Sequence, residues 1–321
     1  MQIHRTTTRT PHRRPAGAVC CAVLAVAALC SSAAAQLNFE TRTLETPDGP
    51  CIVYIASVDL TDPRVEIVVT GPRTQADAEA ILVQTAAWAK EQEVDVAVNA
   101  NFFALLPEPG QTKAAPGYSA GRRSDILGLS VSDGVVVSPP RIVGGRPDPA
   151  LVIGSDGIAR IGAIGSVGGV HDAVAGIGAS RAEDPAAALL VTDGVNTAAA
   201  ARVDPARRHP RTAAGVSADG RTLWLVAADG RQPGYSVGLT LPELADLFIS
   251  LGADDALNLD GGGSTAFVQR TPEGSWITNR PSGGSFRPVA NHLGVRVRPA
   301  VEAAAPNTPP QKESTTSSDP K

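Results

Sequence analysis

A strand, helix, strand pattern over residues 222–260 constrains the fold of this chain most strongly. The apolar run TLWLVAADG (222–230) predicts a buried strand, and the run DALNLD (255–260) predicts a second. Between them, Thr240 and Glu243 have capping-box spacing, apolar residues recur at helical spacing, and a glycine follows the last of them. This order predicts a βαβ unit with parallel strands and a right-handed crossover.

The fold expected from this pattern is α/β (mixed α+β). We predict a central mixed sheet that contains at least one βαβ unit, with helices packed on it. A second helix is expected from Thr74 to Glu91, followed by a strand in VDVAVNANFF (94–103). The sequence has no repeat of fixed period and no strong internal linker, so a single domain over residues 36–302 is the simplest organisation.

Both ends of the chain differ in composition from its middle. Residues 1–35 contain four arginines, an apolar stretch and three final alanines, which is the layout of a secretory signal peptide. We expect cleavage between Ala35 and Gln36 and a secreted or periplasmic protein. Stable membrane insertion is not expected, because no later stretch is apolar for long enough. Residues 303–321 hold prolines, hydroxyls and charges, and we expect a disordered tail.

The cysteine and charge content of the chain argue against a disulfide-stabilised protein and against a nucleic-acid-binding protein. Three of the four cysteines lie in the expected leader, so Cys51 is left alone, no internal disulfide can form and stability must come from a core. The whole chain has a formal net charge of -4, and the leader holds four arginines and no acidic residue, so the remainder carries -8. An acidic chain without a basic tract is a poor candidate for nucleic-acid binding.

Polar side chains cluster where the expected strands end. Asp229 ends the first strand of the βαβ unit and Asp260 ends the second, and ligands of α/β sheets collect outside the carboxyl ends of strands. Because side chains alternate along a strand, Asn258 and Asp260 share a face, and so do Asn99 and Asn101. A buried amide needs hydrogen-bond partners, so two such pairs favour a shared site over independent turn-forming roles.

The stretch NLDGGGSTAF (258–267) follows an aspartate with three glycines and two hydroxyl side chains. Glycines permit positive φ and let a ligand approach backbone N–H groups, so this loop could hold an anion such as a phosphate. The alternative is a tight turn into the next strand. The candidates of this loop are Asp260 as a catalytic carboxylate and Gly261, Gly262, Ser264 and Thr265 as binding residues.

Several competing motifs are missing from the sequence. No lysine follows the glycines as in a P-loop, Ser264 is not in G-x-S-x-G, and one glycine run is no dinucleotide fingerprint. After the leader the histidines are His171, His209 and His292, with no H-E-x-x-H, so we expect no zinc. We expect no cofactor and assign no metal ligands. The sequence leaves open a Ca²⁺ or Mg²⁺ at Asp260, although no EF-hand spacing supports it.

Arginines in polar loops could balance the charge of a bound anion, because guanidinium groups recognise phosphate and carboxylate bidentately. Arg211 and Arg287 stand in Pro-, Gly- or Ser-rich loops and are the favoured contacts. Glu243 is interpreted as the capping-box acid. The same loops also contain His209 and Arg231, further binding candidates, and Arg207, Arg208 and Arg280, for which we prefer a solvated surface role.

Three ordered stretches resemble one known family: VNANFF, the run from Arg208 to Phe267, and NRPSGGSFRPVANHLGV (279–295). Together they are similar to the phosphodiester glycosidase domain, a family that includes N-acetylglucosamine-1-phosphodiester alpha-N-acetylglucosaminidase and many exported bacterial proteins. The resemblance spans residues 90–298. Where the family has an Asn-Gly-Gly-Phe-Phe type of run, Asn99 matches its asparagine and Asn101 replaces a glycine.

The resemblance implies a hydrolase that cleaves the anomeric C–O bond of a sugar 1-phosphodiester on a small molecule or glycan. A phosphate monoester has a second pKa of about 6, so it leaves without much help from a general acid, and one carboxylate could replace the usual glycosidase pair. We expect Asp260 to act as nucleophile or base, with Asp229 as second carboxylate. The expected contacts to sugar or phosphate include Asn99, Asn258, Ser264, Arg211, Arg287 and the glycine N–H groups.

Two other classes of function stay open on the sequence. One is a non-catalytic protein that binds a glycan or envelope polymer, because a fold does not fix a function. The other is a metal-dependent phosphodiesterase that cuts the P–O bond. The shortage of metal-ligand clusters speaks against the second, and the full set of polar residues speaks against the first.

Overall fold

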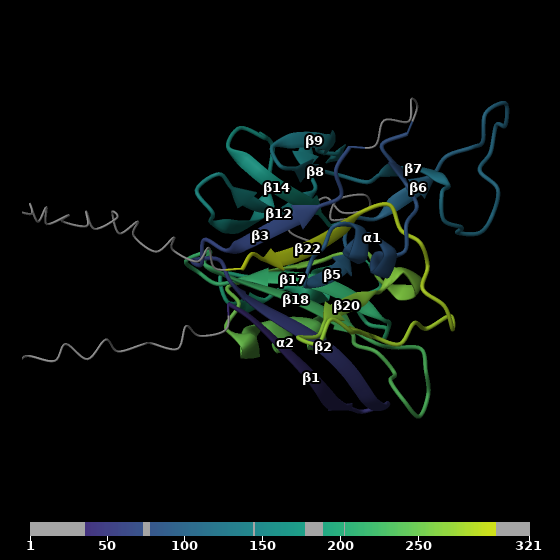
Figure 1. Cartoon of the computed structure of the whole chain (residues 1–321). Helices are drawn as coiled ribbons and strands as arrows, with labels where there is room; N and C mark the ends of the chain where they lie inside the picture. Colours follow the sequence, from purple (N-terminus) through teal and green to yellow (C-terminus); the bar gives the residue numbers. More distant parts are fainter. Residues whose placement is uncertain (1–35, 73–77, 144, 177–188, 202, 300–321) are drawn as a thin grey trace, which may run out of the picture. The chain divides into compact units, whose positions relative to one another are not determined.

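The computed structural model describes residues 36–72, 78–143, 145–176, 189–201 and 203–299. The expected leader, the expected tail and the first residues of the expected helix at Thr74 lie outside the described residues. Strands dominate the described part, which contains two α-helices, α1 (Thr85–Glu91) and α2 (Leu241–Leu251) (Figure 1). Neither described helix has the length and apolar character that crossing a membrane requires.

The largest sheet has seven strands, and every neighbouring pair in it is antiparallel. Its order is β1 (Leu37–Thr46), β2 (Gly49–Asp59), β18 (Thr222–Ala228), β17 (Arg211–Val216), β19 (Asp255–Asn258), β15 (Leu189–Thr192) and β16 (Val195–Asn196).

The expected α/β fold with a βαβ unit is wrong. The segments β18, α2 and β19 follow one another as the pattern predicts, but β18 and β19 do not pair, because β17 lies between them and is antiparallel to both. A local pattern shows which residues are buried, but it does not show which distant strand enters beside them. The described protein is therefore a mainly antiparallel β structure with two helices, not a sheet built from βαβ units.

The remaining strands form two five-stranded sheets and two smaller ones. One five-stranded sheet has the order β21 (Trp276–Thr278), β20 (Phe267–Arg270), β5 (Val96–Asn99), β22 (His292–Val297) and β3 (Val65–Val69). The other has the order β13 (Ala159–Ala163), β12 (Pro149–Gly154), β14 (Val170–Ala175), β8 (Ser130–Ser132) and β9 (Val135–Ser138). The smaller sheets are β4 (Ala80–Ile81) with β7 (Arg123–Ile126) and β6 (Phe103–Leu105), and the hairpin of β10 (Ile142–Val143) and β11 (Arg146–Pro147).

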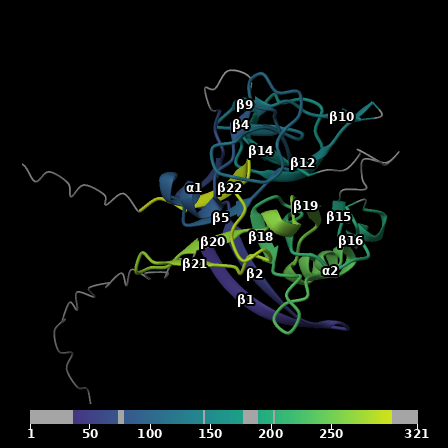
Figure 2. The ribbon, with the colours of Figure 1, turned by 90° about the vertical axis from the view of Figure 1, so that its right-hand side faces the viewer.

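Strand β18 illustrates how the core is divided. Leu223 and Leu225 point into a cluster that also contains Val98 of β5 and Leu293 of β22, so this face packs between sheets. Trp224 and the other alternate residues point to the opposite face, where α2 packs. The continuous apolar run thus reflects a strand covered on both faces. Figure 2 shows α2 beside β15 and β16, which it contacts.

The two helices differ in how well the sequence predicts them. In α2, the Thr240 side chain accepts a hydrogen bond from the Glu243 N–H and the Glu243 carboxylate accepts one from the Thr240 N–H, so the capping box is confirmed. Gly252 ends this helix with a φ of 96°. The helix expected over 74–91 is not continuous in the described part of that range, 78–91, where Thr85–Glu91 is helical and Ala80–Ile81 pairs with β7.

Candidate active site

Strands of two different sheets end side by side at the candidate site. Asp260 follows β19 of the seven-stranded sheet, and its backbone N–H donates to the carbonyl of Ala100, which follows β5 of a five-stranded sheet. Leu259 donates its backbone N–H to the carbonyl of Thr212 in β17. The carboxylate is therefore carried at a junction of three strands rather than at the parallel edge that the sequence predicts.

The side chain of Asn99 holds this junction together through hydrogen bonds. Its Nδ2 donates to the Asp260 carbonyl at 2.6 Å, and its Oδ1 accepts from the Thr212 hydroxyl at 2.7 Å and from the Ala266 N–H at 3.0 Å. The side chain is 1% exposed. Asn99 therefore positions the backbone of Asp260, and these contacts give it a holding role rather than a place against a ligand.

Two of the three glycines, Gly262 and Gly263, make room for arginines. Gly262 has a φ of 61°, and a Cβ there would lie 3.2 Å from both terminal nitrogens of Arg231. A Cβ on Gly263 would overlap the guanidinium group of Arg287. The loop N–H groups are partly used within the protein, since Gly261 donates to the carboxylate of Asp260 at 2.8 Å. Close approach of two cations is the clearest physical reason for this glycine run.

The side chains of Arg231, His209 and Asp204 are linked by hydrogen bonds, which hold Arg231 in place. Its Nε and Nη2 lie 3.3 and 3.2 Å from Nδ1 of His209, whose Nε2 lies 2.8 Å from Oδ2 of Asp204. Because Nδ1 accepts from the guanidinium group, the imidazole hydrogen resides on Nε2 and is donated to Asp204. Asp204 and Arg231 both have left-handed backbones, with φ of 50° and 58°. Such strain costs about 1–3 kcal/mol and gathers at functional sites.

Arg287 approaches the glycine loop from the C-terminal part of the chain. Its Nη1 donates to the hydroxyl of Ser264 at 3.2 Å, and its guanidinium carbon lies 4.1 Å from the centre of the Tyr118 ring. Two cations thus lie over consecutive glycines beside Asp260, each held in a defined geometry.

The carboxylate of Asp260 is a stronger base than an ordinary aspartate. Burial raises its pKa to about 6, against the opposing effects of a hydrogen bond from Ser264, the charge of Arg287 and the N–H of Gly261. It is therefore mostly ionised at neutral pH while remaining able to bind a proton or attack an electrophile. A carboxylate with a pKa raised in this way is a candidate catalytic group.

A pocket of about 240 Å³ opens over Asp260. Asn258 lines it and is 4% exposed, and its Oδ1 has no hydrogen-bond partner among the described residues. A buried acceptor without a partner is costly, so a ligand donor would complete it. The lining consists of Phe102, Val203, Asp204, His209, Arg211, Arg231, Asn258, Asp260, Gly261 and Gly262.

Arg211 lines this pocket but is largely committed to the protein. Its Nε donates to Leu239, its Nη1 to Val203, and its Nη2 to Asp204 and Arg207, in each case to the backbone carbonyl. Burial lowers its pKa to about 10, so it stays charged at neutral pH. Arg211 thus holds the 203–207 segment against the pocket, and most of its donors are used in doing so.

Six predicted residues do not line the pocket: Asn99, Ser264 and Arg287, described above, and Asp229, Asn101 and Thr265. Asp229 is 1% exposed, accepts from Asn279 Nδ2 at 2.8 Å and from the Arg280 N–H, and has its pKa raised by burial. Asn101 accepts from the Ala175 N–H and from Asn291, so it ties β5 to the neighbouring sheet. Thr265 is buried, and its hydroxyl has no partner among the described residues.

Some lining residues were missed by reasoning from the sequence. Phe102 directly follows Asn101, and its place in the run NANFF was the only available signal. Val203 and Asp204 precede the basic segment RRHPR, where an acid five residues before His209 gave a faint signal. Tyr118, which contacts Arg287 but does not line this pocket, was also missed, because it lies in a segment rich in glycine and proline that has no motif.

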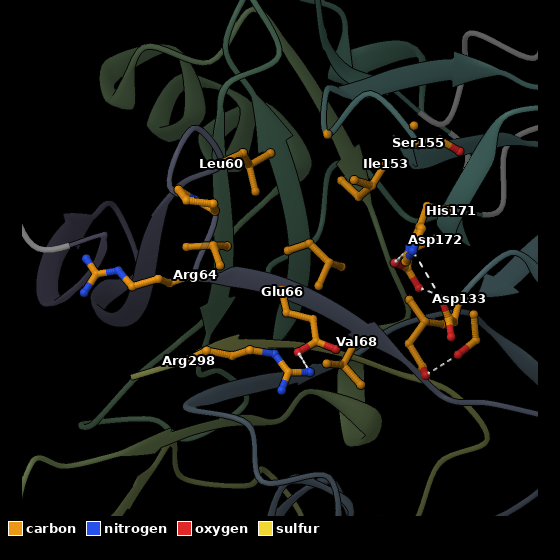
Figure 3. A pocket seen from close by; sticks show the side chains of 17 residues that line it. Leu60, Arg64, Glu66, Val68, Asp133, Ile153, Ser155, His171, Asp172 and Arg298 are labelled. Carbon is orange, nitrogen blue, oxygen red and sulfur yellow. Dashed lines mark hydrogen bonds and ion pairs between the residues drawn. The ribbon is translucent and has the colours of Figure 1, made fainter. Parts of the chain in front are cut away.

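A larger pocket of about 450 Å³ lies elsewhere, along β3 (Figure 3). Its charges are already paired: Glu66 with Arg298 at 2.8 Å, and His171 with Asp172 at 2.7 Å and Asp133 at 3.2 Å. The hydrogen bond that His171 donates to the carboxylate of Asp172 raises the pKa of His171. The pocket over Asp260 is the better candidate, because it holds a buried acceptor that still needs a donor.

Within the described ranges, no group of three or more His, Cys, Asp or Glu side chains is arranged to hold a metal ion.

The chain is similar to known proteins in both sequence and structure. The sequence profile of the phosphodiester glycosidase family matches residues 75–296. The catalytic domain of zebrafish N-acetylglucosamine-1-phosphodiester alpha-N-acetylglucosaminidase, auto-inhibited by its pro-peptide, is 19% identical, with a TM-score of 0.58 over 83% of this chain and 85% of that one. A hypothetical protein from Synechocystis is 16% identical, with a TM-score of 0.53 over 82% of this chain and 62% of that one.

A curated relative shares part of the sequence. The SPbeta prophage-derived uncharacterized protein YomE of Bacillus subtilis (strain 168) is 30% identical over 175 residues, which are 51% of this chain and 25% of that protein. The chain therefore spans about a quarter of that relative's length. The structural likenesses show a shared fold, and the profile match covers most of the chain. The chain belongs to the phosphodiester glycosidase family.

Proposed function

We propose that this protein is an exported hydrolase that cleaves the anomeric C–O bond of a sugar 1-phosphodiester, on a cell-envelope or extracellular glycan. The observation that supports it best is the half-buried Asp260 with its raised pKa, set beside two arginines that lie over the glycine loop. Membership of the phosphodiester glycosidase family supports the same reaction class. Export is proposed from the leader pattern at residues 1–35.

The chemistry needs one carboxylate and a stabilised leaving group. Asp260 either attacks the anomeric carbon or takes a proton from the attacking water. The C–O bond breaks with its electron pair on the phosphate oxygen, and Arg231 and Arg287 balance the charge that develops there. The Oδ1 of Asn258 accepts a hydrogen bond from the sugar. Each role uses a side chain that faces the glycine loop or its pocket.

The pocket offers no second carboxylic acid at neutral pH. Asp204 also lines it, but the hydrogen bond from His209 lowers the pKa of Asp204, which keeps it ionised. An ordinary glycosidase protonates its leaving group with such an acid. A phosphate monoester, whose second pKa is about 6, leaves without that proton. The charge state of the pocket therefore favours a phosphate over an alcohol as leaving group.

The test is hydrolysis in ¹⁸O-labelled water. The mature protein is incubated with a panel of sugar 1-phosphodiesters that includes an N-acetylglucosamine 1-phosphodiester. We expect the label on the released sugar, undiminished turnover in EDTA, and loss of turnover in Asp260→Asn but not in Asp219→Asn, which changes an exposed turn residue.

Other outcomes would contradict the proposal. Label on the phosphate, with inhibition by the chelator, would indicate a metal-dependent phosphodiesterase. Saturable glycan binding without release of sugar from any panel member would indicate a binding protein. Normal turnover by folded Asp260→Asn would remove Asp260 from the mechanism.

A further inference from the structure

We propose that Asp229 is a positioning residue, whose buried carboxylate fixes the end of the glycine loop and thereby the groups that surround Asp260. Asp229 lies outside the pocket over Asp260, so it acts through other residues and not on the substrate. The inference rests on the proposed function, because it concerns the surroundings of the carboxylate that carries the proposed reaction.

The carboxylate of Asp229 is surrounded by hydrogen-bond donors. Its Oδ1 accepts from Asn279 Nδ2 at 2.8 Å, and its Oδ2 accepts from the Arg280 N–H at 3.0 Å and from the Tyr235 hydroxyl at 3.3 Å. A carboxylate accepts only, which suits a site made of donors. The side chain is buried, and burial raises its pKa, so the fold keeps an unfavourable charge where a substrate cannot reach it.

Asn279 transmits this anchor to the end of the glycine loop. Because its Nδ2 donates to Asp229, its Oδ1 faces the other way and accepts from the Phe267 N–H at 2.7 Å. Asn99 accepts from the neighbouring Ala266 N–H at 3.0 Å. The segment that follows the glycine loop is therefore held by two buried amides, and Asp229 sets the orientation of one of them.

Ser264 connects this segment to the carboxylate of Asp260. It stands at the last position before the held segment, it makes a hydrogen bond to Asp260, and it accepts from Arg287 Nη1 at 3.2 Å. The hydrogen bond from Ser264 and the charge of Arg287 both lower the pKa of Asp260. A shift of the loop end would therefore weaken the groups that stabilise Asp260 as an anion.

The segments that carry the two arginines also meet at Asp229. Asp229 directly follows β18, and Arg231 stands two residues later with a left-handed backbone. The Arg280 N–H, bound by the same carboxylate, opens the connection from β21 to β22 that carries Arg287. The guanidinium carbon of Arg280 lies 4.6 Å from the centre of the Tyr235 ring, which joins the two segments a second time.

The first experiment measures the pKa of Asp260 without any substrate. The side-chain carboxyl carbons of aspartate are labelled with ¹³C and titrated by NMR, and the resonance missing in Asp260→Asn identifies Asp260. In Asp229→Ala we expect the pKa of Asp260 to rise by about 1, as for a carboxylate that loses part of its cationic and hydrogen-bonded support. Loss of the negative charge of Asp229 alone would lower that pKa or leave it unchanged. The direction therefore separates positioning from a direct effect of charge.

Three further variants serve as controls. Asp172→Ala removes another buried carboxylate, which accepts from His171 and from the Asp133 N–H beside the pocket along β3, and it should leave the titration of Asp260 unchanged. Asp229→Asn keeps an acceptor for Asn279, so its effect should be smaller than that of Asp229→Ala. Ser264→Ala should raise the pKa of Asp260, and adding it to Asp229→Ala should raise it little further, because both act through one hydrogen bond.

A second experiment uses the acid limb of kcat on a substrate that wild type hydrolyses. In Asp229→Ala this limb should move to higher pH by the same amount as the NMR titration, whereas in Asp172→Ala it should stay in place. Circular dichroism and thermal unfolding verify that the variants are folded. If Asp229→Ala does not fold, Asn279→Ala breaks the same link and is interpreted in the same way.

The outcomes separate the two proposals. If wild type hydrolyses no sugar 1-phosphodiester but the pKa of Asp260 rises in Asp229→Ala, the proposed reaction fails and the positioning role stands. If that pKa falls or stays unchanged in folded Asp229→Ala, or rises equally in Asp172→Ala or Asp229→Asn, the positioning role is overturned and the proposed reaction is unaffected.

Discussion

Asp260 meets two opposing requirements at the scale of a single residue. Its carboxylate is half-buried, which is unfavourable for a charge, and only a hydrogen bond from Ser264, the charge of Arg287 and one backbone N–H offset part of that cost. The fold therefore keeps this carboxylate at the expense of stability, as is common where function requires an unfavourable environment.

The first prediction concerns the stability of an Asp260→Asn variant. The folded pKa of Asp260, about 6, lies above its ordinary value of 3.8, so this group favours the folded state at low pH and loses that contribution as pH rises from about 4 to 6. Removing the carboxylate should stabilise the protein by about 1–3 kcal/mol at pH 7 and have little effect at pH 3.5.

Urea unfolding at the two pH values measures this difference. Asp219→Asn, in an exposed turn, should show no comparable gain at pH 7. A destabilised but folded Asp260→Asn protein at pH 7 would mean that the carboxylate is better solvated or better paired than its surroundings indicate.

A second prediction concerns the pH dependence of activity. With Asp260 acting in its ionised form, as proposed, kcat should rise through a pKa of about 6. The charge of Arg287 lowers this pKa, so Arg287→Gln should move the acid limb to higher pH, in addition to weakening phosphate binding. The pH profile of kcat is the measurement, and a limb that stays in place or moves down in Arg287→Gln would contradict the assignment.

At the scale of elements, the site depends on how strand ends are joined. β5, β17 and β19 come from two sheets, and Asn99 bonds to the backbone or side chains of residues beside all three. Local patterns predicted β5, β18, α2 and β19 correctly, because alternation and capping are properties of short segments. The contacts between these elements involve residues far apart in sequence, and no local pattern encodes such contacts.

Asn99→Ala should weaken both stability and catalysis. It leaves the Thr212 hydroxyl, the Ala266 N–H and the Asp260 carbonyl without their partner, which should cost about 2–4 kcal/mol of unfolding free energy and lower kcat. Asn196 is a matched control, since it also makes three hydrogen bonds, to Pro242, Asp246 and Ala198, away from the pocket. Asn196→Ala should destabilise without a change in kcat; an equal kcat loss in both variants would argue against positioning by Asn99.

The capping box of α2 gives a prediction about stability alone. Thr240→Ala removes the acceptor for the Glu243 N–H, so unfolding free energy should fall by about 1 kcal/mol, while kcat and KM stay unchanged. Thermal or urea unfolding beside steady-state kinetics tests both parts. An unchanged stability would mean that the Arg208 and Glu243 ion pair already secures the helix start.

At the scale of the whole molecule, β17 explains why the fold was mispredicted. Its sequence RTAAGV consists mostly of small residues and lacks the β-branched runs that indicate strands. Small residues are required there, since a Cβ on Gly215 would lie 2.5 Å from Cδ1 of Phe248 in α2. The strand is therefore specified by what packs over it, and that information lies outside its own segment.

The candidate site was predictable only in part for the same reason. The stretch NLDGGGST led to Asp260, Asn258 and the glycine loop, because their chemistry is concentrated in one short run. Asp229 was expected on the same crevice, but its carboxylate is occupied by Asn279 and Arg280 and does not line the pocket. Tyr118 reaches the site only through the fold of a long connection, so its residue type alone gave no indication.

The connection at residues 106–122 has a consequence for how this family can diversify. Asp260 is carried at the junction of buried strands, whereas Tyr118 lies in a largely exposed segment. Insertions, deletions or exchange of that segment should change the surface beside Arg287 and leave the position of Asp260 unchanged. Homologues with segments of different length and composition would then share one position of the carboxylate and differ in the surface next to it.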